Sequence, residues 1–349
     1  MKYKPEIQVV LKRLKAFWKK DIYDRPPILI RFPIAGESPE IWTNACQKAE
    51  THFAYWDNIM QERSKLADDS IPSATLDLGP AFMPAVMGCP IHFGNGTSWS
   101  DHILKEWADL KDLQNWPLDD NNQWIYEMKK RIAYFTEQSK GKCAVGVAML
   151  TGPGDIMTAL RGPTEICTDF YLYPNEVKVL AEICTKAWIT VNNIQLDLIP
   201  PLEGGYCDNY SYWTPGRTSY FADDISNLIS PETYMEHLYR FDAVIAASND
   251  NPWMHVHSGG ARLVPEFRKI SGLKGIQIVN DRPAGPKLKE ILSYIKMVQE
   301  NHCLILRKYP MEELLDILPE LSPKGLYIDT FCGSLEEAQE ILEDWNSRF

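Results

Sequence analysis

Residues 272–329 read GLKGIQIVNDRPAGPKLKEILSYIKMVQENHCLILRKYPMEELLDILPELSPKGLYID. The runs at 275–279, 303–306 and 326–329 are short and apolar, as the buried strands of a parallel sheet are. Residues 285–300 and 311–318, which separate these runs, have the apolar spacing of amphipathic helices. This regular alternation predicts repeated β-α units.

The same alternation extends in both directions along the chain. Further candidate strands are 144–150, 204–210 and 253–257, and further helical patterns are 174–197, 231–247, 262–270 and 335–345. The runs PILIRFP (27–33) and SATLDL (73–78) bring the number of strands to eight. Eight β-α units predict an α/β fold of the TIM-barrel type. We expect one domain over residues 1–349, with a helical lead-in at 1–25 and long loops over the C-terminal face of the barrel.

The composition excludes several classes of protein. Hydrophobic residues make up 45% of the 349 positions and charged residues 24%, which is typical of a globular protein with a full core. The net charge of −11 offers no positive field for phosphate backbones or anionic lipids, so we expect neither nucleic acid nor a membrane as partner. The N-terminus lacks the apolar core and cleavage site of a secretory signal, which predicts a cytoplasmic location.

Polar residues at the C-terminal ends of the predicted strands are the first candidates for a functional site, because TIM barrels carry their chemistry on that face. These residues come from the second, fourth, fifth, sixth, seventh and eighth strands. They include Asp77, Tyr206, Asp208, Tyr210, His255, His257, Asp281, Arg307 and Cys332.

Three of these side chains suit a metal ion. In HVHSGG (255–260), two histidines stand two residues apart on a predicted strand, so the alternation of the pleat sends both to the same face. Cys332 follows the eighth strand, whose end opens onto the same mouth of a closed barrel. Two imidazoles and a thiolate would bind zinc and leave a fourth position open.

Simpler interpretations of these residues remain open. A single HxH pair often binds carbonyls or carboxylates, and a lone cysteine is often a small buried apolar residue. The pair Asp223-Asp224, which precedes a helix, is most simply a capping pair.

Several segments, in order along the chain, resemble the uroporphyrinogen decarboxylase superfamily. They are TGPGDIMTALRG (151–162), DDISNLISPETYMEHLY (223–239), HVHSGG (255–260) and GLKGIQIVNDRPAGP (272–286). The resemblance covers the chain from about Pro26 onward and also implies a TIM barrel. True decarboxylases carry an MRQAGRY-like segment near the N-terminus, whereas this chain reads IRFPIAGESPE at 30–40.

The sequence is more similar to the cobalamin-dependent methyltransferase branch of that superfamily. There, a His-x-Cys pair and a distant cysteine hold a zinc ion that activates a thiol. By position these ligands fall on His255, His257 and Cys332, so one thiolate is replaced by a neutral imidazole. This replacement leaves the zinc more positive, which lowers the nucleophilicity of a bound thiolate and favours activation of water or an alcohol.

The resemblance implies a zinc-dependent methyltransferase that moves a methyl group between a corrinoid and a small acceptor. The chain has no DxHxxG-type corrinoid segment, so we expect the cobalamin to be supplied by a separate corrinoid protein as partner. We expect His255, His257 and Cys332 to bind the zinc. The expected catalytic residues are His257, Asp77 and Asp208, and the expected substrate-binding residues are Tyr206, Tyr210, Asp281 and Arg307.

Two alternatives stay open from the sequence. One is a metal-independent decarboxylase of a tetrapyrrole or smaller acid, which would use Asp77, Tyr210 and Arg31. The other is a barrel that binds a small molecule or a corrinoid protein without catalysis.

Overall fold

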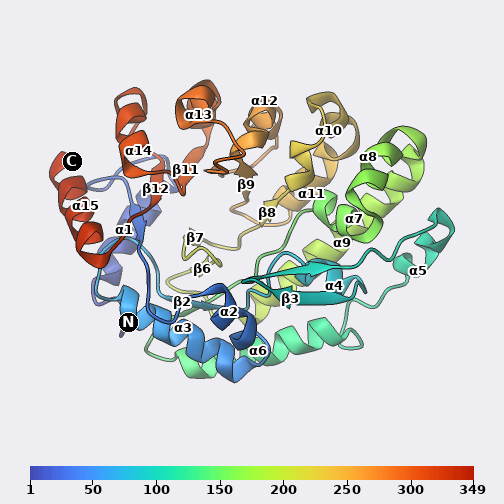
Figure 1. Cartoon of the computed structure of the whole chain (residues 1–349), viewed down its shortest axis with the longest axis horizontal. Coiled ribbons are helices and arrows are strands. Elements are labelled where there is room, and N and C mark those ends of the chain that lie inside the picture. The colour runs from blue at the N-terminus through green and yellow to red at the C-terminus, as the bar shows by residue number, and fades with distance from the viewer.

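The computed structural model describes residues 1–349 and has an α/β fold in which helices surround mostly parallel strands (Figure 1). The strands are β1 (Ile28–Arg31), β2 (Ser73–Thr75), β3 (Ile91–Gly94), β4 (Thr97–Ser100), β5 (Ala144–Gly146), β6 (Gly205–Cys207), β7 (Trp213–Pro215), β8 (Tyr220–Ala222), β9 (Trp253–His257), β10 (Gly275–Val279), β11 (Cys303–Arg307) and β12 (Leu326–Phe331).

In Figure 1 most of the helices lie along the top and the bottom of the view, around the strands. The α-helices are α1 (Ile7–Phe17), α2 (Pro39–Ala45), α3 (Ala49–Arg63), α4 (Phe82–Val86), α5 (Leu110–Gln114), α6 (Gln123–Ser139), α7 (Pro153–Arg161), α8 (Pro163–Leu172), α9 (Pro174–Leu198), α10 (Pro231–His237), α11 (Tyr239–Ala247), α12 (Val264–Phe267), α13 (Leu292–Asn301), α14 (Met311–Ile317) and α15 (Leu335–Arg348). Short 3₁₀ turns are η1 (Trp107–Asp109), η2 (Asp224–Asn227), η3 (Ser258–Leu263), η4 (Leu288–Ile291) and η5 (Leu318–Glu320).

Local sequence signals set several helix starts. The Ser334 hydroxyl accepts a hydrogen bond from the Glu337 backbone N–H at 3.2 Å, and α15 begins at the next residue. Ser230 caps α10 in the same way, ahead of a proline at the first helical position. Both caps satisfy backbone donors that would otherwise lack partners at a helix start.

The strands form two main sheets. The larger has the order β1-β12-β11-β10-β9-β8 and is parallel throughout. The smaller has the order β2-β5-β6-β7, in which only β7 is antiparallel. The β3–β4 hairpin forms a third, separate sheet.

Alternate residues of the strands pack into two different apolar clusters, which shows that both faces of the larger sheet are buried. Met254, Ile276 and Leu304 belong to the large cluster that the strands share with the surrounding helices. Trp253 and Ile305 belong to a second cluster, which α1 completes through Leu11, Leu14 and other side chains. This arrangement leaves the C-terminal ends of the strands available for a site.

The continuous closed barrel expected from the sequence is not confirmed, because the strand ladder stops at two seams. At one seam, the Gly152 backbone N–H donates to the Ala222 carbonyl at 2.5 Å, next to the end of β8. At the other seam, β1 forms a ladder with β12 alone and none with β2.

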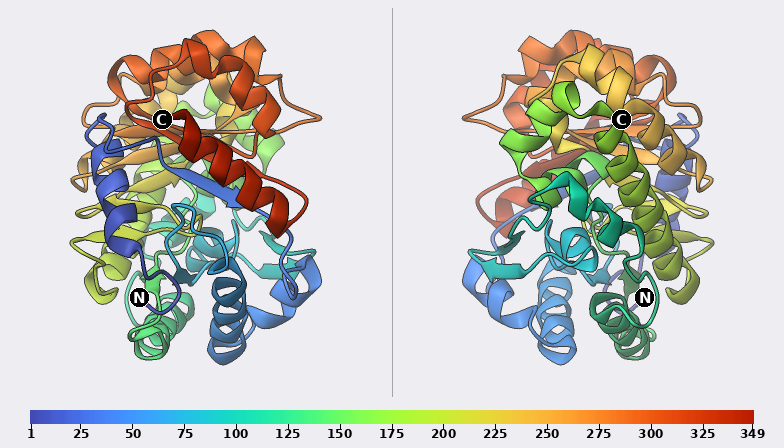
Figure 2. Two further views of the ribbon diagram at one scale, coloured as in Figure 1. Left: turned by 90° about the vertical axis from the view of Figure 1, so that its left-hand side faces the viewer. Right: turned by 90° about the vertical axis from the view of Figure 1, so that its right-hand side faces the viewer.

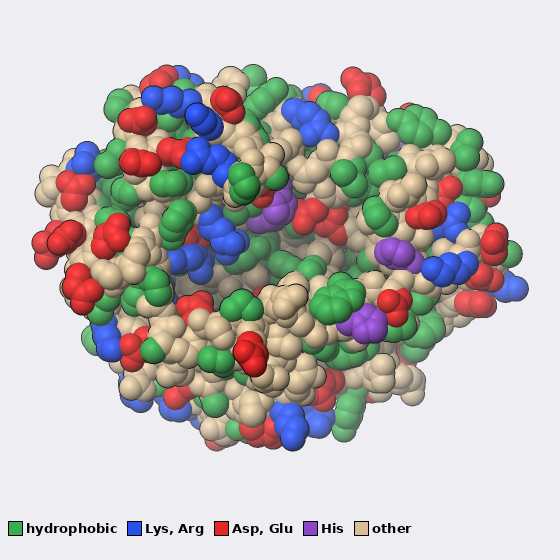
Figure 3. Space-filling model, in the orientation of Figure 1, with side chains coloured by type: hydrophobic (Ala, Val, Ile, Leu, Met, Phe, Trp, Pro, Cys, Tyr) green, Lys and Arg blue, Asp and Glu red, His purple; other side chains and the backbone are tan.

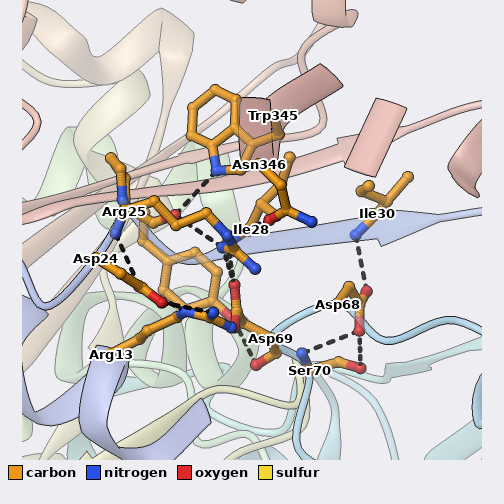
Figure 4. A network of polar contacts seen from close by, with 12 residues as sticks. Arg13, Asp24, Arg25, Ile28, Ile30, Asp68, Asp69, Ser70, Trp345 and Asn346 are labelled. Atoms are coloured by element: carbon orange, nitrogen blue, oxygen red, sulfur yellow. Dashed lines mark hydrogen bonds and ion pairs between the residues drawn. The ribbon is translucent and has the colours of Figure 1, made fainter. Parts of the chain in front are cut away.

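Two buried carboxylates take the place of a ladder along that second edge of β1 (Figure 4). The backbone N–H of Ile28 donates to Asp69 Oδ2 at 2.9 Å, and that of Ile30 donates to Asp68 Oδ2 at 3.0 Å. Arg25 and Arg13 donate to the Asp69 carboxylate at 2.5 and 3.0 Å. Asp68 and Asp69 therefore join α1, β1 and the segment that enters β2.

The last helix packs against the segment that enters the first strand. The Trp345 indole N–H in α15 donates to the Pro26 carbonyl at 2.9 Å, just before β1. Figure 2 shows α15 lying beside β1, although the two elements belong to opposite ends of the sequence.

Several expected element boundaries differ from the structure. The expected strand 204–210 is only β6, after which the chain turns back as β7 and then adds β8, which was not predicted. The expected helix 231–247 is interrupted at Leu238 between α10 and α11, and 285–300 begins as η4. The expected helix 262–270 shortens to α12. None of the helices combines the length and apolar character required to cross a bilayer.

Candidate functional site

A cavity of about 510 Å³ opens at the C-terminal ends of the strands. Figure 3 shows a hollow on this side of the molecule whose walls carry basic, histidine and acidic side chains. Gly96 and Thr97, at the turn of the β3–β4 hairpin, and Trp42 of α2 form part of its wall, as expected for long segments over this face. The expected site residues in the wall are Asp77, Tyr210, His255, His257, Asp281 and Arg307.

The wall includes a group of three side chains that could hold a metal ion. One ligand atom from each of Asp224, His255 and His257 lies within 4.8 Å of the other two. Both histidines are on β9, and strand alternation sends them to the same side. Asp224 begins η2, two residues after β8, which is the parallel neighbour of β9.

His255 is held by a chain of buried hydrogen bonds. Its Nδ1 contacts the amide oxygen of Gln277, the residue paired with it on β10. Because that oxygen can only accept, Nδ1 carries the proton and Nε2 keeps its lone pair. The Gln277 amide donates to the Tyr212 hydroxyl at 3.0 Å, which donates in turn to Asp329 at 2.5 Å. Burial lowers the pKa of His255 to about 4, so the imidazole is neutral, as a metal ligand must be.

His257 is held between two carboxylates. Its Nδ1 lies 2.5 Å from Asp281 Oδ1, and its Nε2 lies 3.4 Å from Asp224 Oδ2. Hydrogen bonds with Asp224 and then Asp281 raise the pKa of His257 to about 10. Asp281 thus orients the imidazole from behind, and the Ser258 hydroxyl donates to the same carboxylate at 3.1 Å.

Cys332 does not belong to this group, which corrects the ligand set expected from the sequence. Its Sγ lies 3.2 Å from the Ser334 carbonyl and 3.7 Å from that of Arg31. Asp329, three residues earlier, points into the interior, so strand alternation turns Cys332 the other way. The thiol packs against the large cluster shared with the helices, and Asp224 takes the third place beside the histidines.

Tyr206 and Asp208 also lie outside the cavity wall, contrary to expectation. The Tyr206 hydroxyl donates to the Leu196 carbonyl of α9 at 2.8 Å, so this side chain faces the helices. Asp208 accepts from the backbone N–H groups of Tyr210 and Tyr212 at 2.8 and 3.2 Å, which closes the turn between β6 and β7. Burial raises the pKa of Asp208 to about 7.

The other expected residues line the same cavity, and the Tyr210 ring lies 5.9 Å from that of His255, centre to centre. Asp77 accepts from the Gly79 backbone N–H at 2.9 Å and from the Asn209 amide at 3.3 Å, and burial raises its pKa. The guanidinium of Arg307 lies 3.6 Å from the centre of the Tyr210 ring. All three of Asp77, Tyr210 and Arg307 therefore contribute to one cavity.

Asp224 was missed by sequence reasoning because the strand before it was missed. The run TSYFA (218–222) is short and lies inside a longer irregular stretch, so Asp223-Asp224 was interpreted as a helix cap. A signal was present, since Asp224 follows its strand by two residues, as Asp77 follows β2. Gln277 and Tyr212 gave no such signal, because their importance depends on the register between strands.

The donor set of two imidazoles and one carboxylate suits zinc with one open position, and it also suits ferrous iron. In both histidines Nδ1 is occupied by a neighbouring side chain, as is usual around bound metals. Nε2 of His255 has no protein partner, whereas Nε2 of His257 faces the Asp224 carboxylate, so a metal ion held by both would replace the proton between them. The residues present therefore fit a catalytic metal ion. They differ from the expected set in having a carboxylate where a thiolate was expected.

A second cavity of about 480 Å³ adjoins this site. Its wall is mostly apolar or small and includes Pro84, Trp99 and Leu228. Asp224, Thr151 and Pro80 line both cavities, so the metal-binding carboxylate stands where the two spaces meet.

Comparisons with known proteins identify the fold. No protein-family model matches the sequence, and no curated protein matches it. Among solved structures, a methyltransferase from Methanosarcina mazei matches with a TM-score of 0.67. The chain shares the fold of that protein. The match covers 97% of this chain and 98% of the other at 14% sequence identity. It therefore describes the architecture of the whole chain, while the expected superfamily membership stays a prediction.

Proposed function

We propose that the chain is a metal-dependent methyltransferase in which Asp224, His255 and His257 hold a zinc ion. The observation that carries the proposal is the convergence of these three ligand atoms at the mouth of a cavity, with both imidazoles oriented from behind. The methyltransferase-like fold supports the choice of reaction.

A zinc ion at this place would act as a Lewis acid on the atom that accepts the methyl group. Asp281 and Gln277 keep the two imidazoles in place, so the site needs little rearrangement during the reaction. Asp77 lines the same cavity, and its raised pKa suits it to take the proton that the acceptor loses.

The two adjoining cavities suit a reaction between two substrates. Methyl transfer requires a donor and an acceptor to approach the same methyl carbon from opposite sides. A corrinoid presented by a partner protein is the donor implied by the sequence resemblance, and a small molecule in the cavity that contains Asp77 would be the acceptor.

One contact argues against the decarboxylase alternative. The Nε and Nη2 groups of Arg31 already donate to Asp329, at 2.8 and 2.9 Å, and Arg31 does not line the cavity. Arg31 is therefore committed to the protein's own network.

Metal analysis with two variants tests the proposal. We expect about one zinc per chain, an affinity reduced at least about 100-fold in Asp224→Asn, and an unchanged affinity in Cys332→Ser, which is the matched control. Zinc lost with Cys332→Ser but kept with Asp224→Asn would overturn the site.

The activity is tested separately by methyl transfer from free methylcobalamin to small thiols and alcohols. We expect turnover by the zinc-loaded chain and its loss in Asp224→Asn. A zinc-loaded chain that transfers no methyl group to any acceptor would overturn the activity and leave the metal site standing.

A further inference from the structure

Arg307 ends β11 inside the cavity with most of its hydrogen-bonding capacity unused. Its side chain is buried, with 8% of the residue exposed, and it lines the cavity wall. Its only acceptor in the protein is Asp329, which the Nε group reaches at 3.2 Å. Neither Nη group has a protein acceptor, so up to four N–H donors face the cavity.

Arg307 and Arg31 share a single ion-pair partner. Asp329 is fully buried and accepts both nitrogens of the Arg31 fork as well as the Tyr212 hydroxyl. One carboxylate thus serves two guanidinium groups, because Arg307 has no second carboxylate within 4.0 Å. A buried charge that shares its counter-charge destabilises the folded chain. An anion in the cavity would give Arg307 a carboxylate of its own.

Lys308 adds a second cation at the same place. It lines the cavity, and its ammonium group forms no ion pair. Its φ of 59° lies in the left-handed region, which a residue with a side chain rarely adopts. The Lys308 backbone N–H donates to the Asp329 carbonyl at 2.7 Å, and the Asn280 amide donates to the Lys308 carbonyl at 2.9 Å. These two bonds hold the residue in that conformation.

The guanidinium of Arg307 is also fixed in orientation. The Tyr210 ring covers one of its faces at 3.6 Å, while Asp329 holds its Nε edge. A guanidinium held in this way presents its Nη edge to a planar anion and loses little side-chain entropy on binding.

We propose that Arg307 and Lys308 form an anion-binding end of the cavity, which takes the carboxylate of a short-chain acid. The inference rests on the proposed function, since the reacting atom of the acid would lie at the Asp224–His255–His257 end. His257 and Arg307 pair with the same residue, Val279, from its two sides. Their backbones are therefore two strand spacings apart, roughly 10 Å, which favours a compact substrate.

The experiment compares 3-mercaptopropionate with its neutral analogue 3-mercaptopropan-1-ol by calorimetry, on the metal-free and on the zinc-loaded chain. We expect the acid to bind about 10- to 100-fold more tightly than the alcohol in both forms. Arg307→Gln should reduce this preference to less than about twofold, and Lys308→Met should reduce it about three- to tenfold.

Lys296→Met is the matched control, because Lys296 lies on α13 and pairs with Glu320 outside the cavity. It should keep the full preference. Equal binding of acid and alcohol by the native chain, or a preference that survives in both Arg307→Gln and Lys308→Met, would overturn the inference. Preference for the acid in a chain that transfers no methyl group would instead overturn the proposed activity alone.

Discussion

The amide oxygen of Gln277 accepts the Nδ1 proton of His255 from the neighbouring strand, and this bond decides which imidazole nitrogen faces the cavity. The bond belongs to a buried chain that continues through Tyr212 to Asp329. The metal-ligand end of the cavity and its cationic end are thus joined beneath the floor by hydrogen bonds.

Removal of that amide should weaken metal binding without removing a ligand. In Gln277→Ala the imidazole of His255 loses its fixed tautomer and orientation, so we expect zinc affinity to fall about 10- to 100-fold. Competition with a fluorescent zinc chelator measures the effect. Gln339→Ala, at an exposed position of α15, is the control and should bind zinc as the native chain does. Equal affinities in the two variants would contradict the orienting role.

A side chain added at the seam between Gly152 and Ala222 should disturb the metal site. A Cβ at Gly152 would collide with the Ala222 carbonyl, and Asp224 follows Ala222 by two residues. We expect Gly152→Ala to displace Asp224 and lower zinc affinity at least about 10-fold in a chain that still folds. The control is Gly333→Ala, where the added Cβ would meet only the flexible end of Glu337 at 3.2 Å. Native affinity in Gly152→Ala, with an intact circular-dichroism spectrum, would contradict this coupling.

Asp208 should make stability depend on pH in a particular direction. Burial raises its pKa from 3.8 to about 7, so between these values the folded chain keeps a proton that the unfolded chain has lost. The contribution of protonated Asp208 to the free energy of unfolding is therefore complete below about pH 4 and is lost as the pH rises through about 7. Asp208→Asn removes this dependence, which changes the slope of unfolding free energy by up to about 1.4 kcal/mol per pH unit.

Urea unfolding at several pH values between about 4 and 8 measures that slope. Asparagine can still accept from the Tyr210 and Tyr212 backbone, so the turn should survive. Asp344→Asn, on the surface of α15, should leave the slope unchanged. If Asp208→Asn has the same slope as the native chain, Asp208 is ionised in the folded state and the expected direction is wrong.

The carboxylate of Asp69 should be worth far more to stability than that of Asp24, although both bind Arg13. Asp69 is fully buried and also holds Arg25, so Asp69→Asn leaves a buried guanidinium without its counter-charge. We expect a loss of about 3–5 kcal/mol in unfolding free energy. Asp24→Asn affects a carboxylate that is 42% exposed and should cost about 1 kcal/mol or less. Denaturant unfolding of both variants measures the two losses of unfolding free energy. Equal losses for Asp69→Asn and Asp24→Asn would contradict the importance of burial.

The strands that the sequence predicted well are those buried on both faces. The runs at 275–279 and 303–306 became β10 and β11 almost residue for residue, because continuous apolar runs between helices allow few other interpretations. β8 escaped prediction because its three residues carry too little pattern. The hairpin of β6 and β7 was concealed for a related reason, since the turn depends on the side chain of Asp208 rather than on glycine or proline.

The site was predictable where it depends on the alternation of one strand. His255 and His257 converge because they are two residues apart on β9. The third ligand could not be chosen in the same way, because Asp224 and Cys332 both follow strands. Which of the two side chains points toward the histidines depends on how the chain turns after each strand. The spare binding capacity of Arg307 was equally hidden, because it arises where Arg31 on β1 and Arg307 on β11 share the one carboxylate of Asp329 on β12.

The pairing of β1 with β12 also bears on how the protein is made. Ile28 emerges from the ribosome long before its ladder partner Ile328, and β1 has no other strand beside it. Asp68 and Asp69 can satisfy one edge of β1 early, but the other edge stays open until synthesis is nearly complete. The nascent chain is thus exposed to intermolecular strand pairing through its first strand, and truncation ahead of β12 would leave that edge permanently unpaired.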